Sequence, residues 1–206
     1  MQERGDIIYY PLFINIEEKP CLIVGAGKIA LKKAKKLMEY GAEVEILSSD
    51  IDEDFYQIIP DEKLIKKDYQ KKYIKNKFMV IAATDDYQLN KKIAADAKEE
   101  GALFNAVDQI ELCQFIVPAI VNRKDLQIAI STSGKSPALA GIIRRELEST
   151  FGSEYEDYLK ELGVLREYIK DKVKDPKLRK DLLIKMAELV YERGSKNAES
   201  SQEIKD

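Results

Sequence analysis

The chain has 206 residues, 45% of them hydrophobic and 34% charged, which is enough for one medium-sized domain or two small ones. A net charge of −3 argues against binding nucleic acid through bulk positive charge, and we find no apolar run that suits a membrane span or a signal peptide. Two widely separated cysteines favour a reduced, cytoplasmic protein. The absence of histidine excludes histidine-ligated zinc, and two distant cysteines do not suit a thiolate site, so we predict no metal site.

The first predicted elements are a strand, a helix and a second strand, which together form a β-α-β unit. An apolar strand at 20–24 leads into GAGKIA, and the helical spacing that follows ends at Gly41, a typical C-cap. The second strand is predicted at 43–47. The pattern G-x-G-x-x-A between strand and helix is the dinucleotide-binding fingerprint in its alanine-ending form. The alternative is a glycine turn in some other α/β protein.

Each position of this fingerprint has a physical reason. Gly25 permits the tight turn, Gly27 lets the backbone approach a pyrophosphate, and the small Ala30 lets the helix pack close to the sheet. The free N–H groups at the helix N-terminus attract the phosphates. Further along the same helix, we interpret a group of lysines as a solvated face: Lys32, Lys33, Lys35 and Lys36.

The alternation of strands and helices continues and predicts an α/β fold with a doubly wound parallel sheet. Strands are predicted at 78–83 and 103–107, with a helix at 89–100 between them. Ligands of such sheets bind beyond the carboxyl ends of the strands. We therefore expect the residues at these ends to converge on one crevice, with Thr84 and Asn105 contacting a cofactor. The full set is Gly25, Ser48, Ser49, Thr84, Asn105 and Asp108.

The second half of the chain is organised differently. β-prone runs at 113–121 and 126–131, separated by the polar turn NRKD, indicate a hairpin outside the nucleotide-binding domain. Ser136 and Pro137 fit the N-cap and first position of a helix at 138–149.

The C-terminal part is predicted to be helical. One helix is expected at 154–171, and another at 176–193, opened by Pro176 and ended by Gly194. The polar segment that follows, 195–206, is predicted to be a disordered tail.

Several sequence blocks resemble the precorrin-2 dehydrogenase domain of sirohaem synthases. In order, they are YPLFINIEEKPCLIVGAGKIALKKAKKLMEYGAEVEIL, ATDDYQLN, NAVD and FIVPAIVNRKDLQIAISTSGKSPALAGIIRRELE. The resemblance covers about Tyr10 to Glu148, whereas the C-terminal helices match only in placement and length. It implies oxidation of precorrin-2 to sirohydrochlorin in sirohaem biosynthesis, with NAD accepting a hydride while the macrocycle loses a proton.

The same resemblance implies an architecture. We expect a homodimer with an N-terminal Rossmann domain, a small central β dimerisation region and a C-terminal helical region. The predicted parts are an NAD-binding domain, a central dimerisation and substrate-loop region, a helical region and a tail, at 1–112, 113–150, 151–194 and 195–206.

The resemblance also implies roles for individual residues. It assigns the cofactor loop and the ribose-contacting segment to Gly25, Gly27, Lys28, Ile29, Ser49 and Asp50. Asp50 favours NAD over NADP, because an acidic residue after the second strand contacts the ribose. Asp108 matches an aspartate proposed for catalysis, and no histidine competes with it as a base. The alternatives are that water takes the proton and that Asp108 only caps a turn.

The segment ISTSGKSPA ends like a Walker A phosphate loop but does not fit that pattern. The first glycine would have to be at the position of Ala129, and Pro137 directly follows GKS. Precorrin-2 is rich in carboxylates, so we interpret the segment as a carboxylate-binding loop. The alternative is an ordinary capped loop. The substrate-binding candidates are Arg123, Ser131, Thr132, Ser133 and Lys135.

Two other functions remain open at this point. One is a bifunctional dehydrogenase and ferrochelatase, which would also insert iron into sirohydrochlorin. The other is a non-catalytic NAD-sensing module, which the glycine loop alone would permit. For the dehydrogenase, we expect a separate methyltransferase to supply the substrate and a separate chelatase to receive the product, with neither nucleic acid nor membrane as a partner.

Overall fold

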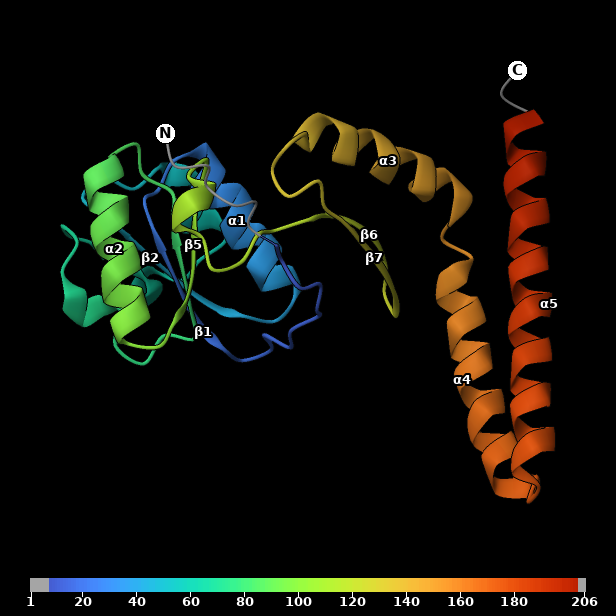
Figure 1. Ribbon diagram of the computed structural model, residues 1–206. Coiled ribbons are helices and arrows are strands. Elements are labelled where there is room, and N and C mark those ends of the chain that lie inside the picture. The colour runs from blue at the N-terminus through green and yellow to red at the C-terminus, as the bar shows by residue number, and fades with distance from the viewer. Residues whose placement is uncertain (1–7, 204–206) are drawn as a thin grey trace. The chain divides into compact units, whose positions relative to one another are not determined.

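The computed structural model describes residues 8–203, which divide into two compact units between Ile116 and Val117 (Figure 1). The first unit contains a five-stranded parallel sheet in the order β3-β2-β1-β4-β5, which confirms the predicted doubly wound arrangement. Chain order reverses at β1, the position where such sheets bind ligands. The strands are β1 (Pro20–Val24), β2 (Glu43–Ser48), β3 (Leu64–Lys66), β4 (Met79–Ala82) and β5 (Leu103–Ala106).

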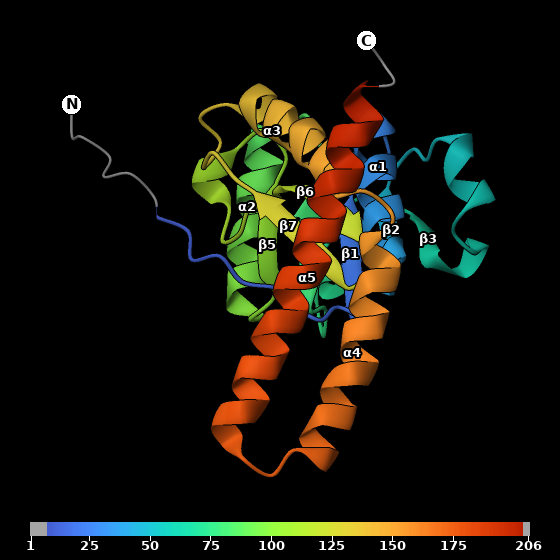
Figure 2. The ribbon, with the colours of Figure 1, turned by 90° about the vertical axis from the view of Figure 1, so that its right-hand side faces the viewer.

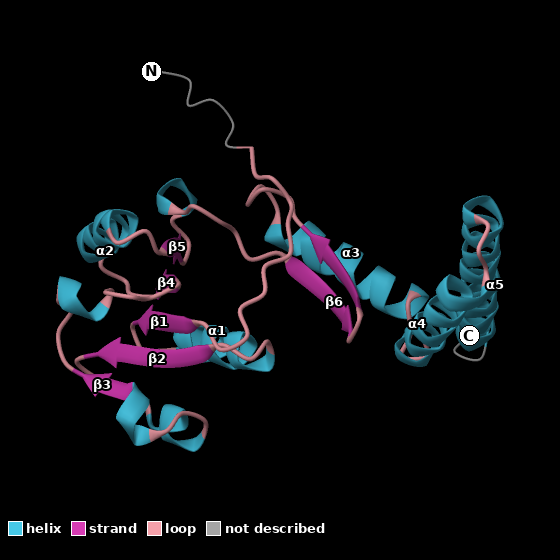
Figure 3. Ribbon diagram, turned by 90° about the horizontal axis from the view of Figure 1, so that it is seen from below, coloured by secondary structure: helices cyan, strands magenta, loops and turns pink. Residues whose placement is uncertain are grey.

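The two long helices of this unit cover opposite faces of the sheet, which Figure 3 shows from below. Successive strand residues point to opposite faces, and β1 is apolar on both. Ile23 therefore packs in one cluster with Ala30 of the first helix, whereas Leu22 packs in the other with Ile93 of the second. The helices are α1 (Lys28–Glu39) and α2 (Tyr87–Glu99).

The predicted elements of the β-α-β unit agree closely with the structure, but β3 was not predicted. It has only three residues, Leu-Ile-Lys, and pairs with β2 at the edge of the sheet. So short a run carries no readable periodicity. The remaining short elements of the unit are 3₁₀ helices of three to five residues: η1 (Glu53–Gln57), η2 (Asp61–Lys63), η3 (Lys71–Tyr73) and η4 (Ile110–Leu112).

The second unit begins with an antiparallel hairpin of β6 (Ala119–Arg123) and β7 (Leu126–Ile130). The hairpin was predicted, but its first strand is shorter than the expected 113–121. Residues before Pro118 bond to β5 instead, since the Gln114 N–H donates to the Phe104 carbonyl at 2.9 Å. Pro118 itself has no N–H to offer a strand ladder.

Three helices complete the second unit, namely α3 (Pro137–Thr150), α4 (Tyr155–Lys172) and α5 (Pro176–Glu203). Ser136 is the N-cap of α3, as predicted, because its hydroxyl accepts from the Leu139 N–H at 3.2 Å. Helices α4 and α5 lie side by side and run in opposite directions in both Figure 1 and Figure 2. In the described part of the chain, no helix combines the length and the apolar composition of a membrane span.

The predicted helix end at Gly194 is wrong, because α5 continues to Glu203. The predicted disordered tail is therefore helical from 195 to 203, and 204–206 lie outside the described residues. Gly194 is buried, and a Cβ at this position would collide with the side chain of Tyr155 in α4. The glycine is thus explained by a close approach of two helices and not by a left-handed cap.

Candidate functional site: a cleft at the carboxyl ends of the parallel strands

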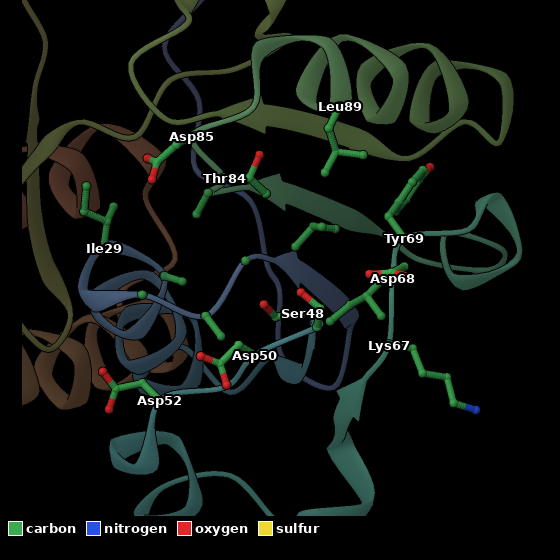
Figure 4. A pocket seen from close by; sticks show the side chains of 18 of the residues that line it. Ile29, Ser48, Asp50, Asp52, Lys67, Asp68, Tyr69, Thr84, Asp85 and Leu89 are labelled. Atoms are coloured by element: carbon green, nitrogen blue, oxygen red, sulfur yellow. The ribbon is translucent and has the colours of Figure 1, made fainter.

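A cleft of about 660 Å³ opens at the carboxyl ends of the strands in the first unit. Four segments line it, namely the glycine loop after β1 and the residues that follow β2, β3 and β4 (Figure 4). Of the residues predicted to contact a cofactor, all except Asn105 lie here: Gly25, Gly27, Lys28, Ile29, Ser49, Asp50 and Thr84.

Gly25 begins the loop with a conformation that suits glycine. Its φ is +104°, and its N–H donates to the Leu47 carbonyl of β2 at 2.9 Å. A Cβ at this position would lie 2.8 Å from the carbonyl carbon of Ala83 and closer still to its oxygen. The turn therefore brings the backbones after β1 and β4 together in a way that a side chain would prevent.

Gly27 is the N-cap of α1 and has a different role. Its φ of −90° is open to any residue, and a Cβ here would meet nothing within 4 Å. The first turn of α1 has neither a side-chain cap nor an acidic residue. The helix itself therefore supplies no acidic side chain or side-chain cap to these N–H groups, and the missing Cβ leaves room for a ligand. This cradle fits the pyrophosphate of a dinucleotide.

Carboxylates gather in the segment that follows β2. The Asp50 side chain is 97% exposed, and its Oδ1 lies 3.9 Å from Nζ of Lys66. Asp52 is committed locally, since its Oδ1 accepts from the Asp54 N–H at 3.1 Å and caps η1. Asp50 is thus the acidic side chain most open to a ribose hydroxyl in this segment.

The cleft also contains residues that sequence reasoning missed. Tyr69 follows β3, and its hydroxyl donates to Asp96 of α2 at 2.7 Å. Burial and this hydrogen bond raise the pKa of Tyr69, so the phenol stays neutral. Because β3 was not recognised in the sequence, nothing indicated that the residues after it would lie at the carboxyl end of a strand. The further lining residues outside the expected set include Asp52, Lys67, Asp68, Asp85 and Leu89.

Asn105 does not line the cleft, in contrast to the prediction. Its side chain is buried, and its amide donates to the Phe115 carbonyl at 2.9 Å and to Sγ of Cys113 at 3.4 Å. It therefore ties the chain after η4 back to β5. Burial raises the pKa of the Cys113 thiol, whereas the Ala106 N–H bonded to its sulfur acts to lower it.

Asp108 follows β5 as predicted but lies outside the lining of the cleft. It is exposed and adopts a φ of +58°. Lys33 of α1 is its charged neighbour, and this lysine is half-buried instead of lying on a solvated face. Burial lowers the pKa of Lys33, while Asp108 and then Cys113 act to raise it. A carboxylate and an ammonium group thus lie near each other close to the end of β5.

The loop predicted to bind carboxylates belongs to the second unit. Its hydroxyls accept backbone N–H groups, Ser131 from Ser133 at 3.0 Å and Thr132 from Ser136 at 3.1 Å. The Lys135 N–H donates to the Thr132 carbonyl at 2.9 Å, and Ser133 adopts a φ of +52°. A hydroxyl that accepts a hydrogen bond still has a hydrogen to donate, so Ser131 and Thr132 are suited to a carboxylate ligand.

Arg123 has a structural role that the sequence did not reveal. Its Nε donates to the Phe151 carbonyl at 2.8 Å, and Nη2 donates to the Glu148 carbonyl at 3.0 Å. A third bond joins Nη1 to the Asn122 carbonyl at 3.0 Å. The guanidinium therefore caps the C-terminus of α3, where a cation is favourable, and these bonds differ from the predicted contact with substrate.

Among the residues that the structure describes, no three acidic or cysteine side chains come together as a metal-binding group. Two family models match the chain, one described as "Putative NAD(P)-binding" over residues 12–119 and one as "Sirohaem biosynthesis protein central" over residues 123–150.

Similar proteins point the same way. A siroheme synthase of Psychrobacter sp. (strain PRwf-1) is 42% identical over 166 residues, which cover 80% of this chain and 34% of the relative. A siroheme synthase of Ruthia magnifica subsp. Calyptogena magnifica is 36% identical, with 80% and 35% covered. The chain thus spans about a third of the length of these curated relatives.

A solved structure described as SirC, precorrin-2 dehydrogenase, has a similar fold. The TM-score is 0.71 at 22% sequence identity, and the match covers 93% of this chain and 100% of that one. At this identity the likeness shows the fold alone, and it confirms the predicted α/β architecture with a small antiparallel sheet and C-terminal helices.

Proposed function

Because the chain belongs to the NAD(P)-binding family and continues into a sirohaem biosynthesis central segment, we propose that it oxidises precorrin-2 to sirohydrochlorin with NAD. One observation carries the proposal, namely the glycine loop that opens the N-terminus of α1 to the cleft without a side-chain cap or first-turn acid. A dinucleotide pyrophosphate is the anion that this cradle suits.

The chain's residues would bind and orient the dinucleotide as follows. Backbone N–H groups at Gly27, Lys28 and Ile29 hold the pyrophosphate, and Asp50 accepts from a ribose hydroxyl. When bound, the nicotinamide supplies the site that accepts two electrons and one hydrogen as hydride.

Charge supports NAD over NADP as the cofactor. Carboxylates outnumber ammonium groups around the cleft, with Asp50, Asp52, Asp68 and Asp85 set against Lys28 and Lys67. Lys67 also extends away from the other lining side chains in Figure 4. A 2′-phosphate would be opposed by the Asp50 carboxylate, although the Nζ of Lys66 lies 3.9 Å from that group.

Asp108 is the proposed proton acceptor. Oxidation removes a hydride from one carbon of the macrocycle and a proton from another position, so that NAD is reduced and the base is protonated. Asp108 lies exposed just past β5, close to the ammonium group of Lys33. A carboxylate there can take the proton and release it to water.

An Asp108→Asn variant tests this role. We expect it to lower the rate of NADH formation by about 100-fold or more, the usual size of a general-base contribution, while NADH binding stays unchanged. The measurement is anaerobic turnover of precorrin-2 followed by absorbance, with both NAD and NADP. A variant as fast as the wild type would make water the acceptor.

We further propose that the hydroxyls of Ser131 and Thr132 bind substrate carboxylates, together with Ser133 and Lys135. The protein is proposed to act as a homodimer, since a two-stranded sheet such as β6–β7 leaves both edges unpaired. A methyltransferase that supplies the substrate and a chelatase that takes the product would be its neighbours in the reaction sequence.

The same assay separates the two alternative functions. Ferrous iron is added after oxidation is complete, and sirohaem formation is compared with the protein-free rate. An excess over that rate would favour the bifunctional enzyme. Tight binding of NADH without turnover of precorrin-2 would instead favour the NAD-sensing module.

A further inference from the structure

Asn90 lies directly behind the cleft but does not line it. It belongs to α2, its side chain is fully buried, and its amide hydrogen-bonds to Thr84, which lines the cleft. A buried amide needs partners for both its oxygen and its nitrogen. In Asn90, both requirements are met by the same residue.

Two short hydrogen bonds join Asn90 to Thr84. The amide nitrogen Nδ2 donates to the Thr84 carbonyl at 2.9 Å, and the Thr84 hydroxyl donates to the amide oxygen Oδ1 at 2.7 Å. Only an amide nitrogen can donate to the carbonyl, so this bond fixes which end of the amide faces which group. The amide oxygen is therefore held against the hydroxyl.

This arrangement decides what Thr84 can offer a ligand. A hydroxyl has one hydrogen, and here it is directed at Asn90, because the competing contact to the Asp86 carbonyl is longer, at 3.4 Å. The lone pairs remain, one of them near the Asp86 N–H at 3.3 Å. Thr84 lines the cleft, so a ligand that reached its oxygen from there would meet a lone pair, which suits an O–H or N–H of the ligand and disfavours a phosphate oxygen.

We propose that Asn90 is a positioning residue of the nucleotide site, which holds the Thr84 hydroxyl as an acceptor for a ribose hydroxyl or an amide N–H of the dinucleotide. The inference rests on the proposed dinucleotide binding. The start of α2 does not depend on Asn90, because Asp86 caps it by accepting from the N–H groups of Gln88 at 2.9 Å and Leu89 at 3.0 Å.

The test is NADH binding, followed by fluorescence, to the full chain and a set of variants. Thr84→Val removes the hydroxyl and keeps the shape, and Asn90→Leu removes both amide bonds at similar volume. Each should weaken NADH binding by roughly three- to tenfold, as for the loss of one hydrogen bond. The double variant should bind no more weakly than Thr84→Val alone, because the two residues act through one contact.

Two further variants separate positioning from folding. Asp86→Ala removes the helix cap, so it should lower stability to urea while NADH affinity stays unchanged. Thr84→Ser keeps the hydroxyl and should retain more NADH affinity than Thr84→Val. If Asn90→Leu does not fold, the Thr84→Val and Thr84→Ser pair decides, since equal affinities in these two overturn the proposal.

The remaining outcomes are distinguishable. Losses that multiply in the double variant, or an Asn90→Leu protein that is less stable but binds NADH normally, would overturn the positioning role alone. A wild-type protein that binds neither NADH nor NADPH would overturn both this role and the proposed function.

Discussion

Gly25 and Gly27 belong to one loop, yet substitution by alanine should affect them in opposite ways. At Gly25, alanine would have to adopt a φ of +104° and place its Cβ against the carbonyl group of Ala83. A left-handed conformation costs roughly 1–2 kcal/mol, and forced overpacking roughly 1–3 kcal/mol. We therefore expect Gly25→Ala to lower the free energy of unfolding by about 2–5 kcal/mol.

At Gly27, alanine needs no backbone change, since φ is −90° and a Cβ would meet nothing within 4 Å. Replacing glycine by alanine at an N-cap costs less than about 1 kcal/mol. The methyl group would instead occupy space proposed for the pyrophosphate. An overlap worth roughly 1–3 kcal/mol weakens NADH binding by about 5- to 150-fold.

Urea unfolding and NADH fluorescence titration, applied to both variants, measure the two effects separately. Gly25→Ala should lose stability first and binding as a consequence, whereas Gly27→Ala should lose binding at nearly wild-type stability. A Gly27→Ala protein that binds NADH as tightly as the wild type, or a Gly25→Ala protein as stable as the wild type, would contradict these roles of the two glycines.

Two other predictions concern stability. Arg123→Ala should lower the free energy of unfolding by about 1.5–3 kcal/mol, since it removes charged hydrogen bonds to three carbonyls. Urea unfolding measures this loss, and the KM for precorrin-2 is determined for the same variant. A higher KM with unchanged stability would contradict the capping role. Burial of Cys21 raises the pKa of its thiol to about 11 from 9.0, so the folded state holds this proton more tightly than the unfolded state. The stability from this group, about 2–3 kcal/mol, is therefore complete below about pH 9 and is lost as the pH rises toward 11. Unfolding curves across this range should show a smaller decline in Cys21→Ala, and an equal decline would exclude the thiol as its source.

Local sequence signals predicted the parts of the fold that depend on local physics. The strand at 20–24, the glycine spacing and the helix that ends before Gly41 follow from apolar periodicity and backbone conformation, and all three agree with the structure. Ser136 was likewise identified as an N-cap because capping involves residues only three positions apart.

The features that sequence reasoning missed depend on residues distant in the chain. Tyr69 reaches the cleft because β3 pairs with β2, and Arg123 is explained by a helix end that lies 28 residues further along the chain. Asn90 looks like an ordinary helix residue in the sequence. Its partner Thr84 is only six positions away, but the intervening turn sets their geometry.

At Gly194 and Asn105, the local sequence pattern predicted one role, whereas the structure shows each residue in packing or hydrogen-bond contacts within the protein. Gly194 fits the pattern of a helix end, yet it lies inside α5 where Tyr155 approaches. Asn105 stands near the end of a strand, where ligands usually bind, but its amide bonds to Phe115 and Cys113 within the protein. Tertiary contacts overrode the local signal in both cases.

The most direct test of the proposed function is the stoichiometry of a single anaerobic reaction. Precorrin-2 is incubated with the wild-type chain and excess NAD, and NADH and sirohydrochlorin are quantified from their spectra at completion. The proposal predicts one NADH for each sirohydrochlorin, with no reaction when either NAD or protein is omitted. Sirohydrochlorin formed without NADH, or no oxidation by a chain that binds NADH, would contradict it.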